Sequence, residues 1–334
     1  MEYSIYDIAQ RAGVSKSTVS RVLNAGSVSE KSRQAVLRVL AETGYRPNQS
    51  ARMLRGAQSY VIGIIPSSAD ILLATSATTR LAGMMSCLYE HGYSMLFINE
   101  AQKPSGEAAP FQFLEQHIVD GLIYMQNAES DQVRRAITQH REIVYTGERI
   151  LPDKGLRIYM GNYDYSKLLY DHLMERGHRH ILTIFNHTRG NILRGRRYEA
   201  YVDACQAHGI SPDVGSFLSF DETPQKKICE KFLQGPYTAL FTDGMEYANS
   251  INAAFTQKGL VLGRDFSLVS IERGVEQPAQ GTGITTVALP DYEYGLQAAR
   301  MMLRAIEDPT LEYLDVKLKF ELRDRGSVVW LDPD

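Results

Sequence analysis

The stretch VSKSTVSRVLNAG, residues 14–26, predicts one short helix, because Val19, Val22 and Leu23 lie on a single stripe at helical spacing. The opposite face lacks the mixture of Glu and Lys that usually covers a solvated helix. Its side chains are small or form hydrogen bonds, namely Lys16, Ser17, Ser20, Arg21 and Asn24. This composition indicates a face that contacts a partner.

Helix signals flank the stretch on both sides. Ser4 and Asp7 form a capping-box pattern at the start of a first helix, and Gly13 is a natural stop for it. Ser15 then caps the second helix after a turn of about three residues. A third helix is expected to begin after a Ser29 cap. The sequence therefore predicts a helix, a tight turn, a second helix and a supporting helix.

The charge of the chain is divided unevenly along its length. Residues 1–58 carry nine Lys and Arg against four Asp and Glu, a net charge of +5. The remaining residues carry 27 basic against 35 acidic side chains, a net charge of −8, so that the whole chain is at −3. A basic segment attached to an acidic body indicates that the first part meets a polyanion and the second does not.

Length and composition describe an ordinary globular protein. A chain of 334 residues exceeds the usual range of one domain, so two or three domains are expected. No apolar run approaches the roughly 18 residues of a membrane span, and the start MEYSIYDIAQ has no features of a secretory signal. We therefore expect a cytoplasmic protein without a membrane partner. Cys87, Cys205 and Cys229 are far apart, which argues against a disulfide framework or a zinc site.

Beyond residue 60 the sequence alternates between strand and helix patterns. Expected strands include YVIGIIP, SMLFIN, GLIYM and EIVYTG, followed by HILTIF, SFLSF, TALFT and FSLVSI. Expected helices lie near residues 81–91, 131–140, 163–176, 194–208, 224–233 and 246–258. Two successive sets of β-α units predict an α/β body with two parallel-sheet lobes, and ligands bind such sheets at the carboxyl ends of the strands.

The segments YDIAQRAGVSKSTVSRVLN and VSEKSRQAVLRVLAETGYRPNQSARMLRG closely resemble the N-terminal part of the LacI/GalR (lactose-repressor/galactose-repressor) family of bacterial transcription regulators. The body phrases HLMERGHRHI, ALFTDGMEYA, FSLVSIE and ITTV are similar to that family and stand in its order. Sugar-binding proteins of the bacterial periplasm share the two-lobed fold but lack a helix-turn-helix. The resemblance covers almost the whole chain.

The resemblance implies a small all-α helix-turn-helix headpiece joined to a two-lobed core like that of periplasmic binding proteins. We expect the headpiece at 1–45, a hinge helix and linker at 46–59, and the effector-binding and dimerisation core at 60–334. The first lobe of the core is expected at about 60–160 and 290–308, and the second at about 162–287 and 310–330. The expected assembly is a homodimer, because no leucine heptad follows the last strand.

The implied partner of the headpiece is double-stranded operator DNA with an inverted repeat. In the family, the positions of Lys16 and Ser17 set operator preference and the position of Arg21 contacts bases. Lys16 and Arg21 are suited to guanine O6 and N7, whereas Ser15, Ser20 and Asn24 are suited to phosphates. The expected DNA-binding residues are Tyr6, Ser15, Lys16, Ser17, Thr18, Ser20, Arg21, Asn24, Asn48, Ala51, Arg52 and Leu54.

Residues 47–56, PNQSARMLRG, resemble the hinge helix of the family, which forms on operator DNA and inserts a leucine into the minor groove. Leu54 occupies that position. An apolar wedge there opens a base step and kinks the duplex. The alternative is that Met53 or Leu54 packs against the body.

The implied effector is a small molecule, with a sugar or sugar derivative as the expected class. The family's effector-contacting arginine falls on Arg194, four residues before Tyr198, and Arg196 is the alternative because Arg197 replaces the usual glycine. Carboxylates accept hydrogen bonds from sugar hydroxyls, and aromatic rings stack on sugars. The expected effector-binding residues are Glu148, Arg194, Asp243, Glu272 and Phe220, with Tyr163 a further stacking candidate. Two Asp-to-Glu departures, and Thr242 in place of an asparagine, prevent the assignment of any particular sugar.

No enzyme motif survives its context. Tyr163 and Lys167 have a dehydrogenase spacing without a glycine-rich dinucleotide turn. His178 and His180 are interpreted as surface or packing residues in a helix-to-strand turn. We therefore expect no catalysis, no cofactor and no metal. The alternatives to an effector-released repressor are a small-molecule sensor without a DNA role and a regulator that depends on a co-repressor.

Overall fold

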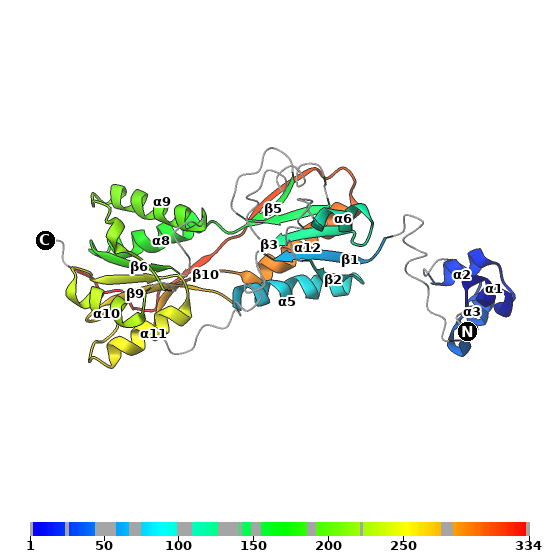
Figure 1. Cartoon of the computed structure of the whole chain (residues 1–334), viewed down its shortest axis with the longest axis horizontal. Coiled ribbons are helices and arrows are strands. Elements are labelled where there is room, and N and C mark those ends of the chain that lie inside the picture. The colour runs from blue at the N-terminus through cyan, green and yellow to red at the C-terminus, as the bar shows by residue number, and fades with distance from the viewer. Residues whose placement is uncertain are drawn as a thin grey trace. The chain divides into compact units, whose positions relative to one another are not determined.

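The computed structural model describes residues 3–23, 27–43, 58–66, 75–98, 109–125, 140, 142–147, 155–185, 192–220, 223–274 and 283–331 (Figure 1). The chain separates into two compact units, Met1–Ser59 and Tyr60–Asp334. Each unit has its own hydrophobic core. None of the helices in these ranges is both long and apolar enough to cross a membrane.

The described part of the first unit holds the three predicted helices, α1 (Ile5–Ala12), α2 (Lys16–Leu23) and α3 (Glu30–Thr43). Their contact is apolar, because Ile8, Val19 and Val36 are fully buried together, one from each helix. A helix of eight residues is unstable alone in water, so this shared core holds α1 and α2 in place.

The predicted caps form at the ends of these helices. The backbone N–H of Asp7 donates to Ser4 Oγ at 3.3 Å, and the Ser4 N–H donates to Asp7 Oδ2 at 2.7 Å. Gly13 ends α1 in the left-handed conformation, with φ of 64°. Ser15 Oγ accepts from the Thr18 N–H at 3.2 Å at the start of α2. The capping box, the stop and the second cap are thereby confirmed.

The first sheet of the second unit has the strand order β11-β5-β4-β3-β1-β2, and the paired strands are parallel. Helices α5 and α12 pack on one face of it, and α6 packs on the other. We call this sheet and its helices the first lobe. Its elements are β1 (Val61–Pro66), α5 (Thr75–Glu90), β2 (Ser94–Phe97), α6 (Ala109–Glu115), β3 (Gly121–Met125), β4 (Ile143–Thr146), β5 (Gly155–Tyr159), α12 (Asp291–Glu307) and β11 (Tyr313–Lys317).

The second sheet has the order β12-β10-β9-β8-β6-β7 and is parallel except for β12, which runs antiparallel to β10. Helices α8 and α9 cover one face of this sheet, and α10 and α11 cover the other (Figure 1). Successive strand residues face opposite sides, so Phe241 packs with residues of α8 and α9 whereas Leu240 packs with residues of α10 and α11. This is the second lobe. Its elements are α8 (Asn162–Met174), β6 (Ile181–Phe185), α9 (Ile192–Ala207), a 3₁₀ turn (Val214–Ser216), β7 (Phe217–Ser219), α10 (Gln225–Gln234), β8 (Ala239–Thr242), α11 (Met245–Thr256), β9 (Ser267–Glu272), β10 (Thr285–Ala288) and β12 (Glu321–Arg323).

One expected lobe boundary is wrong. Residues 310–330 were expected to lie in the second lobe, but β11 pairs with β5 and extends the first sheet. Asp315 lies opposite Arg157 in this pairing, and the Arg157 Nε donates to Asp315 Oδ1 at 2.8 Å. The open edge of β5 therefore receives β11, and the chain returns to the second sheet only with β12. The helix expected near residues 131–140 lies almost entirely outside the described residues.

Candidate functional site

The face of α2 singled out in the sequence is accessible in the first unit. Ser17 and Arg21 are exposed, and Lys16 and Ser20 are half-buried, whereas Val19 and Val22 are buried on the opposite side. This helix therefore presents short hydroxyl side chains beside two long cationic ones. Such a surface suits the major groove of DNA, where short residues permit close approach and long donors reach base edges.

Lys16 is held by a residue of the neighbouring helix. Its Nζ donates to the Tyr6 hydroxyl oxygen at 2.9 Å and lies 4.4 Å from the centre of the Tyr6 ring. Tyr6 itself is 64% exposed. The two predicted DNA-binding residues thus contact each other on the surface. The helical periodicity of α2 does not indicate this contact, because Tyr6 belongs to α1.

Ser15 has a different place from the other predicted residues. Its Oγ lies 2.8 Å from both Ser17 Oγ and Thr18 Oγ1 in addition to capping α2. The hydroxyls at the start of the helix therefore form a small network of their own. The other predicted DNA-binding residues lie outside the described residues, namely Asn24, Asn48, Ala51, Arg52 and Leu54.

Three of the predicted effector residues follow or end parallel strands of the second sheet. Phe220 follows β7, Asp243 follows β8, and Glu272 ends β9. These strands run parallel through the same sheet, so the three residues share its carboxyl edge. Glu148 lies outside the described residues, and the side chain of Arg194 is not described although its backbone lies in the first turn of α9.

Asp243 is paired with two arginines. Arg197 of α9 forms a direct ion pair with Asp243 Oδ2, and Nη2 of Arg273 lies 3.7 Å from Asp243 Oδ1. The Arg197 Nη2 also donates to the Tyr165 hydroxyl oxygen at 2.8 Å. Tyr165 belongs to α8, the helix that follows the first crossing of the chain from the first lobe, and its hydroxyl also contacts Asn162.

Arg197 is the functional candidate that sequence reasoning missed. Only 2% of it is exposed, and its guanidinium carbon lies 5.3 Å from the centre of the Phe185 ring. Burial by itself lowers the pKa of this guanidinium, but the charge of Asp243 outweighs it and the pKa is raised. The signal was present in the sequence, because an arginine stands there in place of the family's glycine.

Glu272 is also held by arginines. Its Oε1 accepts from Arg323 Nη1 at 3.0 Å, and its Oε2 accepts from Arg325 Nη2 and from Thr286 Oγ1, each at 2.8 Å. Burial alone raises the pKa of this carboxyl, but the hydrogen bonds from Arg325 and Thr286 and the charges of both arginines lower it overall. Glu272 is therefore an ionised carboxylate with donors on both oxygens.

Among the described residues, no hydrogen bond or ion pair joins the remaining candidates, Arg196, Tyr163 and Phe220, to Asp243 or Glu272. Arg196 is exposed, pairs with Glu199 at 2.6 Å, and lies 5.1 Å from the centre of the Tyr163 ring. The Tyr163 hydroxyl donates to Asp203 Oδ2 at 2.5 Å. Phe220 is half-buried, with its ring centre 4.3 Å from that of Tyr247.

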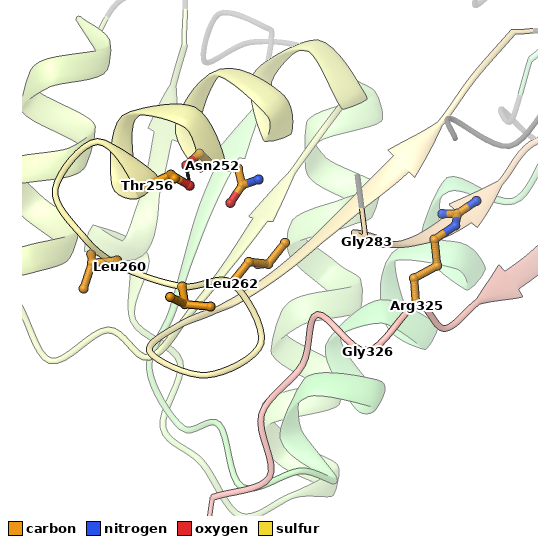
Figure 2. Close-up of a pocket in the computed structure, with 8 residues that line it drawn as sticks. Asn252, Thr256, Leu260, Leu262, Gly283, Arg325 and Gly326 are labelled. Carbon is orange, nitrogen blue, oxygen red and sulfur yellow. Dashed lines mark hydrogen bonds between the residues drawn. The ribbon is translucent and has the colours of Figure 1, made fainter. Parts of the chain in front are cut away.

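A cavity of about 330 Å³ lies elsewhere in the second lobe (Figure 2). Leu260 and Leu262 precede β9 and Gly283 precedes β10, so the cavity is near the amino ends of these strands. Arg325 connects it to the carboxyl edge through its bond to Glu272. We base the effector site on the carboxyl edge because the convergent charged groups lie there. The lining residues are Asn252, Thr256, Leu260, Val261, Leu262, Gly283, Arg325 and Gly326.

The histidine interpretation is confirmed for His178. It is fully buried, and its ring nitrogens lie 2.8 Å from Thr238 Oγ1 and 2.8 Å from Ser267 Oγ. Burial lowers its pKa to about 4, so it is a neutral packing residue. Within the ranges that the structure describes, no cluster of three His, Cys, Asp or Glu side chains is placed to hold a metal ion.

Comparisons with known proteins agree with this architecture. Residues 4–48 match the model for bacterial regulatory proteins of the lacI family, and residues 170–328 match that for a periplasmic binding protein-like domain. The transcriptional regulator RegA of Clostridium saccharobutylicum is 28% identical, covering 98% of this chain and 100% of RegA. The transcriptional repressor PurR of Edwardsiella ictaluri is 26% identical, covering 97% of this chain and 96% of PurR.

A solved structure of the lac repressor dimer bound to operator and the anti-inducer ONPF has the same fold. Its TM-score to this chain is 0.80 at 23% identity, covering 98% of this chain and 100% of the other. The headpiece, the two parallel sheets and these relatives lead to one conclusion. The chain joins a domain of the lacI family of bacterial regulatory proteins, at residues 4–48, to a periplasmic binding protein-like domain, at residues 170–328, and it is similar over almost its whole length to transcriptional regulators.

Proposed function

We propose that this protein is a transcriptional repressor that reads an inverted-repeat operator as a homodimer and responds to a small effector bound at the carboxyl edge of the second sheet. The observation that carries the proposal is the exposed face of α2, with Lys16 and Arg21 in a segment of net charge +5. The lac repressor, which shares the fold, is a dimer on its operator in the structure compared above. Two symmetric headpieces match two half-sites.

The test is operator binding by the full chain at two salt concentrations, on a site selected from random DNA. Affinity should fall steeply with salt because bound lysines and arginines release counterions from the DNA. Arg21→Ala should weaken binding to the selected site by about 1–3 kcal/mol through the loss of a base contact. Equal binding by the wild type and the variant would remove Arg21 from the residues that read bases.

The segment proposed as the hinge helix, residues 47–56, allows a second measurement, the bend of the operator DNA. We propose that Leu54 enters the minor groove, so Leu54→Ala should reduce the bend in the operator as well as the affinity. Gel mobility of circularly permuted operator fragments measures the bend. An unchanged bend would favour packing of Leu54 against the body.

The two alternatives give different results in the same assays. A small-molecule sensor without a DNA role has no salt-sensitive affinity for the selected DNA. A co-repressor-dependent regulator binds more tightly when its effector is added, whereas an effector-released repressor binds less tightly. Light scattering should give twice the mass of the chain, and a tetramer mass would contradict the proposed assembly.

A further inference from the structure

We propose that the effector is an anion, either a sugar acid or a sugar phosphate, and that Arg273 binds its carboxylate or phosphate group. This inference rests on the proposed function, which places the effector at the carboxyl edge of the second sheet. It replaces the broad class of sugars and sugar derivatives with the charged members of that class.

The two acidic residues at this edge, Glu272 and Asp243, are already bound by side chains of the protein. A neutral sugar is held when carboxylates accept hydrogen bonds from its hydroxyls. Here Glu272 already accepts three hydrogen bonds, from Arg323, Arg325 and Thr286. Asp243 is bound by the buried Arg197. Groups of this chain therefore engage both oxygens of Glu272 and the Oδ2 of Asp243, which reduces the capacity of this edge to accept hydrogen bonds from sugar hydroxyls.

Positive charge is in excess at Asp243. Two guanidinium groups face this one carboxylate, and Arg197 takes the closer position. Among the described residues, the contacts of Arg273 are long, 3.7 Å to Asp243 and 3.5 Å to the Tyr165 hydroxyl oxygen. Its side chain is 24% exposed, and its Nε and Nη1 make no hydrogen bond to any residue in the described ranges. Arg273 thus keeps donors and charge for a ligand.

The backbone next to Arg273 is fixed in place by Gly274. Gly274 follows with a φ of 102°, and its N–H donates to Asp291 Oδ2 at 3.3 Å. Asp291 is fully buried and accepts from Arg80 Nε at 2.7 Å. The residue after Arg273 is therefore tied to the start of α12 and, through Asp291, to α5 of the first lobe. A guanidinium carried on a fixed backbone loses less entropy when it binds a planar carboxylate or a phosphate than one carried on a mobile loop.

Arg273 should bind an anionic ligand more tightly than a neutral one. A guanidinium that is largely removed from water and only partly compensated gains most from an anionic partner, because charge-assisted hydrogen bonds are about twice as strong as neutral ones. A neutral polyol would leave that charge uncompensated when it displaced water from Arg273. The site thus discriminates against the neutral form of the same sugar.

The experiment is a thermal-shift and calorimetric comparison of the full chain with matched probes. Glucose is paired with gluconate and with glucose 6-phosphate, and the same pairing is applied to a panel of pentoses and hexoses. At least one acid or phosphate should raise the unfolding midpoint while its neutral parent does not, because a ligand of the native state stabilises it. The gluconate-type and phosphate-type probes separate the two anion chemistries.

The variant Arg273→Gln should weaken binding of that anion by about tenfold to a hundredfold, the effect of losing a charged hydrogen bond. Arg264→Gln is the matched control, since Arg264 is an exposed arginine of the same lobe, in the loop before β9. Both variants keep the basic headpiece, so anion binding there cancels in the comparison. Circular dichroism and operator binding without ligand should match the wild type.

The outcomes separate this inference from the proposed function. A neutral sugar that stabilises the protein as much as its acid overturns the inference, as does an anion response that survives in Arg273→Gln. A panel in which no anion exceeds its neutral parent overturns it as well. In each case salt-sensitive operator binding by the wild type still supports the regulator, whereas loss of that binding contradicts the proposed function itself.

Discussion

The Lys16 ammonium donates to the Tyr6 hydroxyl at 2.9 Å while lying 4.4 Å from the centre of the same ring. One aromatic residue of α1 therefore contacts the cation of α2 in two ways. Both side chains belong to the surface that we propose for DNA binding. The position of the Lys16 ammonium on the surface of the first unit thus depends on α1 as well as on α2, the helix that carries Lys16.

Tyr6→Phe should relax base preference more than it lowers overall affinity. The variant keeps the ring under the ammonium and loses the hydrogen bond from Lys16, which is worth about 0.5–1.5 kcal/mol. Selection from random DNA, followed by anisotropy titrations with single-base operator variants, measures the preference. Tyr3→Phe is the control, because the Tyr3 ring lies 4.6 Å from the guanidinium carbon of Arg11 and does not contact Lys16. Identical base preferences for Tyr6→Phe and the wild type would show that Tyr6 does not position Lys16.

Asp243→Asn should destabilise the second unit strongly. It leaves the buried Arg197 with a neutral partner, and breaking a buried ion pair on one side costs about 3–5 kcal/mol. Glu199→Gln removes the partner of the adjacent but exposed Arg196 and should cost less than about 1 kcal/mol. Urea unfolding followed by tryptophan fluorescence and circular dichroism gives both values. Equal stability losses in the two variants would contradict the buried pairing.

His178 should make the second unit sensitive to acid. Its pKa is lowered by burial from 6.5 to about 4, so the unfolded chain binds a proton that the folded chain excludes between these values. The stabilising contribution is complete above about pH 6.5 and is lost as the pH falls towards 4, by about 3 kcal/mol in total. In His178→Gln the free energy of unfolding should vary less over this interval.

The exposed His180 supplies the control for this pH series. His180→Gln should keep the wild-type slope of unfolding free energy against pH, because it leaves the buried ring of His178 in place. If the slope is the same for His178→Gln and for the wild type, the burial of His178 does not cause the acid sensitivity.

Gly83→Ala should destabilise the first lobe by about 1–3 kcal/mol. A Cβ at Gly83 of α5 would collide with the carbonyl oxygen of Tyr292 in α12, and a backbone atom in a packed helix cannot move aside cheaply. Gly195→Ala in α9 meets no atom within 4 Å and should stabilise its helix by about 0.5–1 kcal/mol. Thermal unfolding of the two variants should therefore shift in opposite directions, and a shared direction would contradict the close contact of α5 with α12.

The sequence alone determined the helices of the first unit, because their signals are local. Ser4 and Asp7 are three residues apart, and Gly13 acts on the helix that it directly follows. The apolar stripe of α2 likewise depends only on spacing along one helix. The alternation of strands and helices predicted the two sheets for the same reason, since each element carries its own periodicity.

The tertiary structure decided which distant residues meet. No local pattern indicates that β11 joins β5, because pairing across 158 residues depends on which sheet edge is open. The sequence also treated Asp243 and Glu272 as free acceptors, whereas Arg197 and Arg325 reach them from other elements of the fold. Ion pairs act through space and leave no periodic signal in the chain. The character of the candidate effector site, acidic in sequence and neutralised by arginines in the fold, therefore followed only from the packing of the second lobe.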